Sequence, residues 1–270
     1  MKRQTAIIFC MGRELLEGTV LDRNANFMAS HVTEAGFRVR TIQVLDDTLE
    51  EAVPVFEHAL SLQPRFLLVT GGMGPGHDDI TRECLARAVG VPMAVDETAK
   101  QHLQSAYRRL VAHGDARHHE INEARLTMAT VPEGSESFEN PVGTAPAIRF
   151  DTGNTIVFLM PGQPEELRRI FQEYVEPVLK SEAPAAFRAI EKLECPGRDE
   201  STISRMLHDL SRRHHSIHAR ARLHGTAAEA RMVITLSAEG ADEDETKAQL
   251  DAAAKDLRAR LGLEVGGMTD

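Results

Sequence analysis

The chain has 270 residues, which is long enough for one large domain or for a domain and a smaller module. Its net charge of −10 and its sequence pI of about 5.7 argue against nucleic acid or an anionic membrane as a main partner. The three cysteines are far apart and form no CxxC pair, so we expect neither a disulfide framework nor a zinc site. Because no segment reaches transmembrane length and the first apolar run is too short for a signal peptide, we expect a cytoplasmic protein.

The first apolar run, residues 5–10, is typical of a buried strand and ends in a loop that contains Gly12 and Glu14. From this loop Glu14 can reach a ligand or metal, although a solvated loop glutamate is the simpler interpretation. Asn24 then stands at the start of an expected helix, where it can equally serve as the cap.

A second strand is expected at residues 37–44, and it runs into Asp46 and Asp47. Asp46, at the tip of the strand, is the better candidate to face a site, and Asp47 is assigned to the turn. Thr48 and Glu51 have the spacing of a capping box for the helix that follows.

The stretch FLLVTGGMGPGHDDIT, residues 66–81, combines a buried strand, a glycine loop and an expected helix start. The loop glycines leave few Cβ atoms, so several amide groups can turn toward one anion. These glycines are Gly71, Gly72, Gly74 and Gly76. Asp78 and Asp79 follow them, and negative charge beside a phosphate makes sense only with a cation such as Mg²⁺ between the two.

A simpler interpretation of this stretch is a plain turn followed by a capping aspartate. The loop has neither the lysine of a P-loop nor the third glycine of the dinucleotide-binding pattern. Phosphate binding therefore remains one of two interpretations of the loop.

Strands and helices alternate up to about residue 90, which predicts a parallel sheet with helices on both faces. Residues 140–146, NPVGTAP, form a rigid turn that can present a backbone amide and a hydroxyl. A strand at 147–150, a hairpin connection at 151–154 and a buried strand at 155–160 follow, and the last ends in the loop PGQP, 161–164.

After residue 184 the pattern changes to a small module with the order β-α-β-β-α. Its strands are expected near residues 187–194, 217–223 and 231–238, and its helices at 201–210 and from 242 onward. His218 and Arg220 share one face of a strand, which we interpret as an exposed polar side rather than a metal-ligand set.

Taken in order, these motifs resemble the molybdopterin-binding family of MoaB and Mog proteins, and most closely the N-terminal part of CinA proteins. The motifs are GRELL at 12–16, DRN at 22–24, DD at 46–47, GGMGPGHDDIT at 71–81, NPVGTAP at 140–146 and PGQP at 161–164. The resemblance implies a three-layer α/β/α fold with a mostly parallel sheet over residues 1–180. Residues 185–265 resemble the small KH-like α+β domain of these proteins, but no GXXG clamp is present, which argues against RNA binding.

The resemblance also implies chemistry at a phosphorus of an adenosine pyrophosphate. CinA-like domains are associated with hydrolysis of ADP-ribose to AMP and ribose 5-phosphate, whereas Mog-like proteins adenylylate molybdopterin with ATP. We therefore expect a metal-dependent ADP-ribose hydrolase. Molybdopterin binding or adenylylation is the first alternative, and a non-catalytic nucleotide- or pterin-binding protein is the second.

Partners and domain content follow from the same resemblance. We expect a small-molecule ligand and a homo-oligomer, with no nucleic acid and no membrane. The chain ends near Asp270, so the C-terminal amidohydrolase domain of full-length CinA proteins is not expected.

The resemblance also implies a role for individual residues at positions that match the family motifs. Asp79 and Asp46 are expected to bind Mg²⁺ or a similar divalent cation, and Asp78 or Glu14 to orient water, while the loop amides hold the pyrophosphate. The other expected substrate contacts are Asn24, Thr81, Asn140, Gly143, Thr144 and Gly162. The chain departs from the CinA pattern at Arg13, Met73, Gly76 and Ala147, positions that bear on substrate identity.

Overall fold

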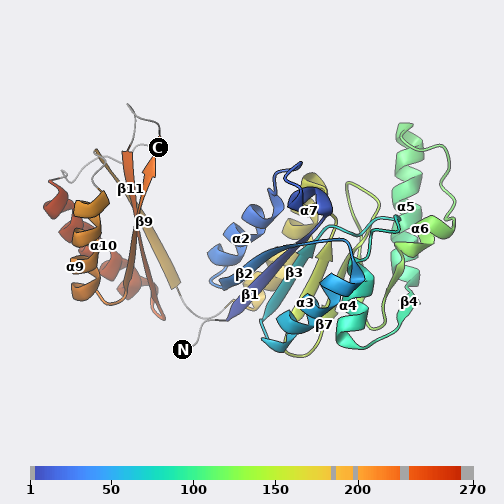
Figure 1. Ribbon diagram of the computed structural model, residues 1–270, viewed down its shortest axis with the longest axis horizontal. Coiled ribbons are helices and arrows are strands. Elements are labelled where there is room, and N and C mark those ends of the chain that lie inside the picture. Colours follow the sequence, from blue (N-terminus) through green and yellow to red (C-terminus); the bar gives the residue numbers. More distant parts are fainter. Residues whose placement is uncertain (1–3, 184–186, 197–199, 226–230, 263–270) are drawn as a thin grey trace. The chain divides into compact units, whose positions relative to one another are not determined.

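The computed structural model describes residues 4–183, 187–196, 200–225 and 231–262. The chain divides into two compact units, Met1–Pro184 and Ala185–Asp270, coloured from blue to yellow and from yellow to red in Figure 1. Residues 184–186, between the two predicted domains, lie outside the described residues. Each unit has a hydrophobic core of its own, so each is described by itself.

A six-stranded sheet with the order β2-β1-β3-β8-β7-β6 forms the centre of the first unit (Figure 1). Its strands are β1 (Thr5–Met11), β2 (Arg38–Leu45), β3 (Phe66–Thr70), β6 (Glu136–Phe138), β7 (Ala147–Asp151) and β8 (Ile156–Met160). The first three and β8 pair in parallel, whereas β7 and β6 run antiparallel to their neighbours. The predicted mostly parallel sheet is confirmed.

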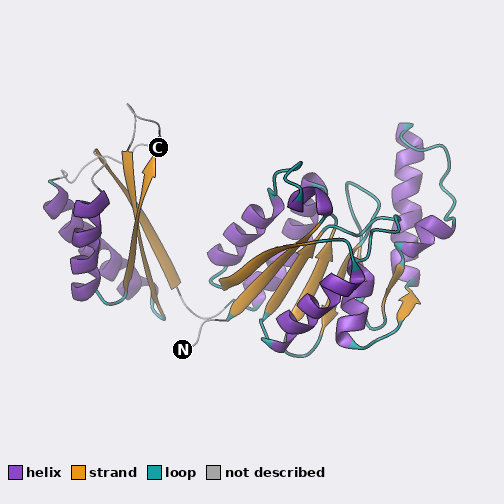
Figure 2. Cartoon of the chain, in the orientation of Figure 1, coloured by secondary structure: helices purple, strands orange, loops and turns teal. Residues whose placement is uncertain are grey.

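Helices cover both faces of this sheet (Figure 2). One face packs against α2 (Asn24–Glu34), α7 (Pro164–Ile170) and α8 (Glu176–Ser181), and the other against α3 (Leu49–Ser61), α4 (Thr81–Val89) and α5 (Glu97–His113). In β1, Ile7 and Phe9 point to the α3 side while Ala6 and Ile8 point to the α2 side. Burial on both faces is the reason that these strands are continuous apolar runs in the sequence.

The remaining elements of the first unit are short, and the sequence did not predict its additional strands. β4 (Met93–Val95) pairs with β5 (Thr130–Pro132), and α1 (Arg13–Leu16) and α6 (Glu123–Thr127) are single turns. Strands of three residues show no alternation, so only their distant pairing partners define them.

Two helix details differ from the prediction. The helix expected after residue 164 is interrupted by a π-helical segment, η1 (Phe171–Val175), before α8. Pro177 has no amide hydrogen for an intrahelical bond, and the π turn accommodates this loss. The capping box at Thr48 does not form, because the buried Thr48 Oγ1 has no hydrogen-bond partner among the described residues.

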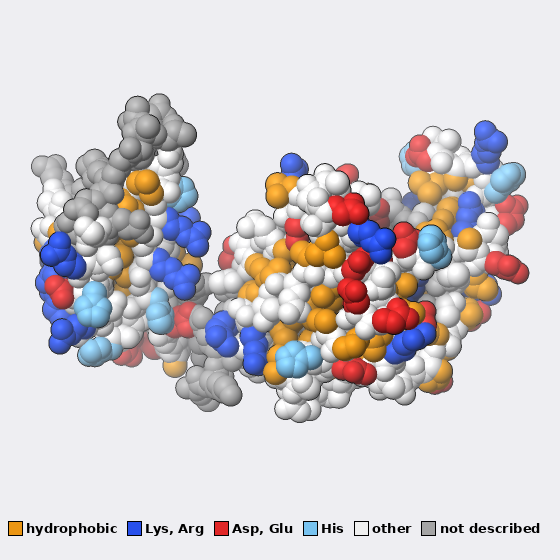
Figure 3. All heavy atoms as spheres, in the orientation of Figure 1, with side chains coloured by type: hydrophobic (Ala, Val, Ile, Leu, Met, Phe, Trp, Pro, Cys, Tyr) orange, Lys and Arg blue, Asp and Glu red, His pale blue; other side chains and the backbone are white. Residues whose placement is uncertain are grey.

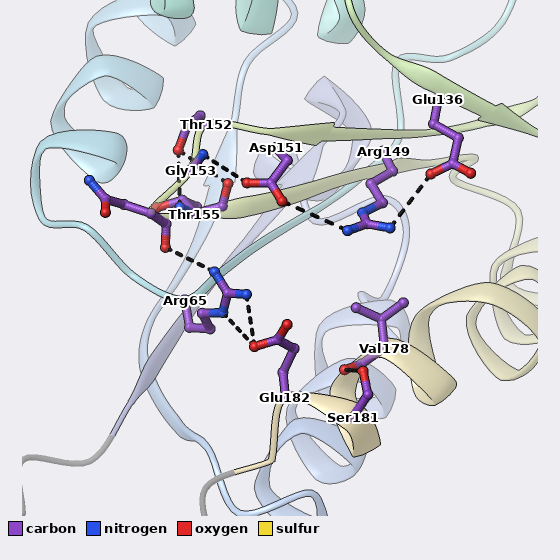
Figure 4. Close-up of polar contacts among 11 residues, drawn as sticks. Arg65, Glu136, Arg149, Asp151, Thr152, Gly153, Thr155, Val178, Ser181 and Glu182 are labelled. Carbon is purple, nitrogen blue, oxygen red and sulfur yellow. Dashed lines mark hydrogen bonds and ion pairs between the residues drawn. The ribbon is translucent and has the colours of Figure 1, made fainter.

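Two arginines near the ends of the sheet strands form ion pairs (Figure 4). Arg65 donates to Glu182 through Nε at 3.0 Å and to the carbonyl of Asn154 at 3.5 Å. Arg149 on β7 lies 3.5 Å from Glu136, its cross-strand partner on β6. Partly exposed pairs of this kind contribute at most about 1 kcal/mol each, so they support the hairpin and the end of α8 without dominating stability.

The second unit is a three-stranded antiparallel sheet, ordered β10-β11-β9, with two helices on one face (Figures 1 and 2). Its elements are β9 (Phe187–Pro196), α9 (Glu200–Arg213), β10 (Ile217–His224), β11 (Arg231–Gly240) and α10 (Glu243–Leu261). This order agrees with the predicted β-α-β-β-α module. In the described ranges of both units, no helix combines the length and the apolar character that a membrane span requires.

Candidate functional site

A cavity of about 590 Å³ lies where the chain leaves the carboxyl ends of β1, β3 and β8. Its walls come from the loops that follow these strands and from the loop after β2. The sheet order places β2 and β3 on opposite sides of β1, so the chain changes direction beside this cavity. Ligands of open α/β sheets bind at such a switch point.

Carboxylates dominate the charge of the cavity. Its acidic lining residues are Glu14, Asp22, Asp47, Asp78, Asp79 and Glu166. Arg23 is the single basic residue among the described residues that line it. A cation bound together with an anionic ligand would reduce the repulsion between that ligand and these carboxylates.

The glycine loop packs tightly against the end of β1. Gly71 and Gly72 have φ values of 95° and 63°, and a Cβ on Gly71 would lie 2.1 Å from the carbonyl oxygen of Met11. Thr81 is fully buried and donates its hydroxyl hydrogen to the Gly71 carbonyl at 2.7 Å. Thr81 therefore supports the loop from behind, in place of the substrate contact that the resemblance implied.

Asp79 turns back onto the glycine loop, and α4 consequently begins at Thr81, later than the sequence predicted. The amides of Gly74 and Gly76 donate to Asp79 Oδ1 and Oδ2 at 2.7 and 2.8 Å. Two of the amides expected to hold a pyrophosphate are thus occupied by this carboxylate. Gly76 does not line the cavity.

Arg82 supports the loop from the protein interior. It is 4% exposed and donates to the carbonyls of Met73 and Gly74. Burial lowers the pKa of Arg82 to about 10, and the charge of Asp79 partly offsets this shift. With Arg82 on the carbonyls and Asp79 on two amides, the amides of Gly72 and Met73 have no acceptor among the described residues.

Asp47 lies at the cavity, where the sequence predicted Asp46. Asp46 lies outside the cavity lining and pairs with Arg13, at 3.0 Å between Nε and Oδ1, whereas Asp47 lines the cavity. The hydrogen bond from Arg13 lowers the pKa of Asp46, while burial raises the pKa of Asp47. Arg13, one of the departures from the CinA pattern, contacts both residues, because its backbone amide donates to Asp47 Oδ2 at 3.0 Å.

Asn140 has a structural role in place of the predicted substrate contact. It is 1% exposed, and its Oδ1 accepts from the amides of Val142 and Gly143 at 3.0 and 2.8 Å. Its Nδ2 donates to the Ala145 carbonyl at 3.0 Å and to Glu166 Oε2 at 2.6 Å. Because these bonds use both donors and the acceptor, Asn140 shapes the turn that places Thr144 at the cavity.

Glu166 is a cavity residue that the sequence reasoning missed. Its carboxylate lies against Gly143, where a Cβ would be 2.3 Å from it, so Gly143 packs on Glu166 and does not line the cavity. Burial raises the pKa of Glu166. A signal was available, because Glu166 follows the PGQP loop at the start of a helix, where carboxylates recur in this chain.

Asn24 joins two of the loops. Its Nδ2 donates to the Gly162 carbonyl at 2.7 Å and to Thr70 Oγ1 at 3.3 Å, and both Asn24 and Gly162 line the cavity. Cys10, at the cavity floor, is buried, and burial together with the nearby Asp22 raises its thiol pKa. We therefore expect an inert thiol there.

The structure brings most of the predicted residues to one place. Those that line the cavity are Glu14, Asn24, Gly71, Gly72, Gly74, Asp78, Asp79, Thr144 and Gly162. Those that do not are Asp46, Gly76, Thr81, Asn140 and Gly143. Contact of the first group with a ligand stays a prediction.

The carboxylates do not form a ready-made metal site. In the described part of the chain, no three His, Cys, Asp or Glu side chains converge well enough to hold a metal ion by themselves. Mg²⁺ is often bound by one or two carboxylates, substrate phosphates and water.

Comparisons with known proteins agree with this geometry. Residues 7–181 match the family described as "Probable molybdopterin binding domain". A protein of Pyrobaculum calidifontis is 34% identical over 254 residues, which cover 94% of each chain. A protein of Thermococcus kodakarensis is 35% identical over 174 residues, which cover 64% of this chain and 69% of that protein. The crystal structure of the protein CinA with unknown function from Thermoplasma acidophilum matches with 30% identity and a TM-score of 0.58, over 65% of this chain and 99% of that one.

The fold and the cavity define an α/β domain with a cavity at the carboxyl ends of a mostly parallel sheet, the place where ligands of such folds bind. The chain belongs to the molybdopterin-binding domain family of MoaB and Mog proteins, as a CinA-like member.

Proposed function

We propose that the cavity binds a phosphorylated pterin of the molybdopterin type together with a divalent cation. The observation that carries this proposal is the acidic cavity built around the glycine loop, with six carboxylates and one arginine in its lining. The family description supports a pterin as the class of ligand.

The loop offers a place for the phosphate. Gly72 and Met73 line the cavity, and their amides have no acceptor among the described residues. Backbone amides in a glycine loop bind anions. Asp47 and Asp79 are the residues that would hold the cation, in place of the predicted pair of Asp46 and Asp79. The cation would neutralise charge between these carboxylates and the phosphate.

Hydrolysis of ADP-ribose is the second candidate, and Asp47 is the observation that favours it. Burial raises the pKa of this cavity carboxyl, with smaller contributions from the charges of Glu14 and Asp78. A carboxylate with a raised pKa is a better general base for water. Water attack on a pyrophosphate phosphorus would break the phosphoanhydride bond and release AMP and ribose 5-phosphate.

One set of titrations separates these proposals. The full-length protein is titrated in a calorimeter with neopterin monophosphate and, separately, with ADP-ribose, in the presence of Mg²⁺, Mn²⁺ or EDTA. Metal-dependent binding of the pterin phosphate supports the first proposal, and metal-dependent formation of AMP supports the second. If neither probe binds with either metal, both proposals fail.

A further inference from the structure

The second unit has a sheet face that none of its own described helices covers. Helices α9 and α10 both lie on the opposite face, as Figures 1 and 2 show. On β10, Ile217 points into the core and is 3% exposed, whereas the outward positions alternate with the core positions and are all exposed. These outward residues are His218, Arg220, Arg222 and His224.

The register of the sheet extends this line of charge across all three strands. Arg220 lies opposite Thr235, which lies opposite Lys192, and His224 lies opposite Arg231. We use the name cationic face for the charged side chains Lys192, Arg220, Arg222 and Arg231 and the two histidines beside them, His218 and His224. Figure 3 shows Lys, Arg and His side chains gathered on this unit.

Acidic side chains on this side of the sheet are few. Glu194 lies 3.4 Å from Arg231, and Glu239 is at the other end of β11. Arg220 and Arg222 have no acidic partner within ion-pair distance among the described residues. The face therefore keeps a positive charge in a chain whose net charge is −10.

The chemistry of the face indicates which partner it suits. Its apolar members are few, chiefly Ile190 and Val233, so it lacks the apolar centre of a typical protein interface. Outward residues along a strand are about 6.6 Å apart, which makes a regular row of charges. A phosphodiester chain is a flexible polymer with a negative charge at each repeat.

The edge of β10 also offers room for such a chain. A depression of about 390 Å³ lies between α9 and this edge strand, and small residues such as Ala219 and Ala221 line it next to Arg220 and Arg222. An extended polymer lying along β10 would thus meet the depression and the arginines together.

We propose that the cationic face binds single-stranded nucleic acid through its phosphates. None of the described outward residues in the middle of the three strands is Phe, Tyr or Trp, so contacts to phosphates rather than to bases carry the binding. The net charge of the whole chain argues against such a partner, but the local distribution of charge governs recognition of a polyanion.

The test is the salt dependence of binding, measured with the full-length protein and a short fluorescent single-stranded RNA by anisotropy. The four Lys and Arg side chains of the face, Lys192, Arg220, Arg222 and Arg231, would make four phosphate contacts. These predict a slope of about −3 for the logarithm of the binding constant against that of salt concentration. In the variant Arg220→Ala/Arg222→Ala the slope should become shallower by about 1.4, and the affinity at low salt should fall on the order of tenfold.

Two matched variants separate charge from folding. Arg205→Ala/Arg212→Ala removes two exposed arginines from α9, on the helical side of the same unit, and should leave the slope unchanged. Arg220→Lys/Arg222→Lys should restore the wild-type slope. The proposal is overturned if the wild type does not bind RNA at low salt or if both alanine pairs weaken binding equally. It is also overturned if polyglutamate of equal charge competes as well as unlabelled RNA.

Discussion

Asp79 Oδ1 accepts the amide hydrogen of Gly74 at 2.7 Å, so the carboxylate closes the glycine loop on itself. The amide of Gly76 donates a second hydrogen bond to the same carboxylate, to Asp79 Oδ2 at 2.8 Å. Arg82 donates to the carbonyls of Met73 and Gly74 on the same loop, so both side chains help to fix its conformation.

Replacing Asp79 by Asn should therefore weaken both the fold and the site. The variant keeps one acceptor oxygen and loses the charge, so we expect a loss of about 1–3 kcal/mol in the free energy of unfolding. Metal-dependent ligand binding should also disappear. Denaturant titration checks the first effect. Asp78→Asn is the control, because Asp78 is exposed and a loss above about 0.5 kcal/mol there would contradict this account.

Arg82 should matter to stability far more than another arginine of the same helix. Arg82→Met leaves the carbonyls of Met73 and Gly74 without their donor, and we expect a loss of about 3 kcal/mol. Arg87→Met removes an exposed ion pair with Glu83 and should cost less than about 0.5 kcal/mol. Equal urea midpoints of unfolding for Arg82→Met and Arg87→Met would show that the hydrogen bonds from Arg82 to the loop do not contribute to stability.

Gly71 and Gly90 test the packing of the loop. Both have positive φ, 95° and 74°, but only Gly71 would place a Cβ against backbone, 2.1 Å from the Met11 carbonyl. We expect Gly71→Ala to cost more than about 3 kcal/mol, and Gly90→Ala, which has open space, about 1 kcal/mol. Thermal unfolding of both variants measures the difference in stability. Similar losses of stability would contradict the close contact between Gly71 and the Met11 carbonyl.

Glu166 gives a dependence on pH with a definite sign. Burial raises its folded pKa above the ordinary value of 4.5, so its contribution to stability is fully present below pH 4.5 and is lost as pH rises through the raised pKa. Glu166→Gln should therefore be more stable than the wild type at neutral pH, and the advantage should vanish as pH falls toward 4.5. Denaturation curves of the wild type and of Glu166→Gln across this pH range measure the difference in stability. A difference that does not change with pH would show that the raised pKa of Glu166 is not its cause.

The fold could be predicted where burial alone determines structure. Residues 66–70 and 156–160 lie between two helical layers, so their strands are continuous apolar runs that are plain in the sequence. β6 could not be found in this way, because its three residues are defined by pairing with β7. The π-helical segment before Pro177 likewise depends on how neighbouring turns adjust to the proline.

The candidate site was predictable in position but not in detail. Glycines next to carboxylates at the strand ends, such as Gly12 and Glu14 after β1, pointed to the edge of the sheet where the cavity lies. The orientation of each carboxylate depends on distant partners: Asp46 turns to Arg13, 33 residues away, and Glu166 is held by Asn140, 26 residues away. No local pattern contains that information.

Asp47 and a divalent cation together are proposed to hold a phosphorylated pterin in the cavity. The most direct measurement is calorimetric titration of the wild type, Asp47→Asn and Asp46→Asn with neopterin monophosphate, each with Mg²⁺ and with EDTA. We predict metal-dependent binding by the wild type and by Asp46→Asn, and loss of the metal dependence in Asp47→Asn. Binding by the wild type that EDTA leaves unchanged, or equal effects of the two substitutions, would contradict the claim.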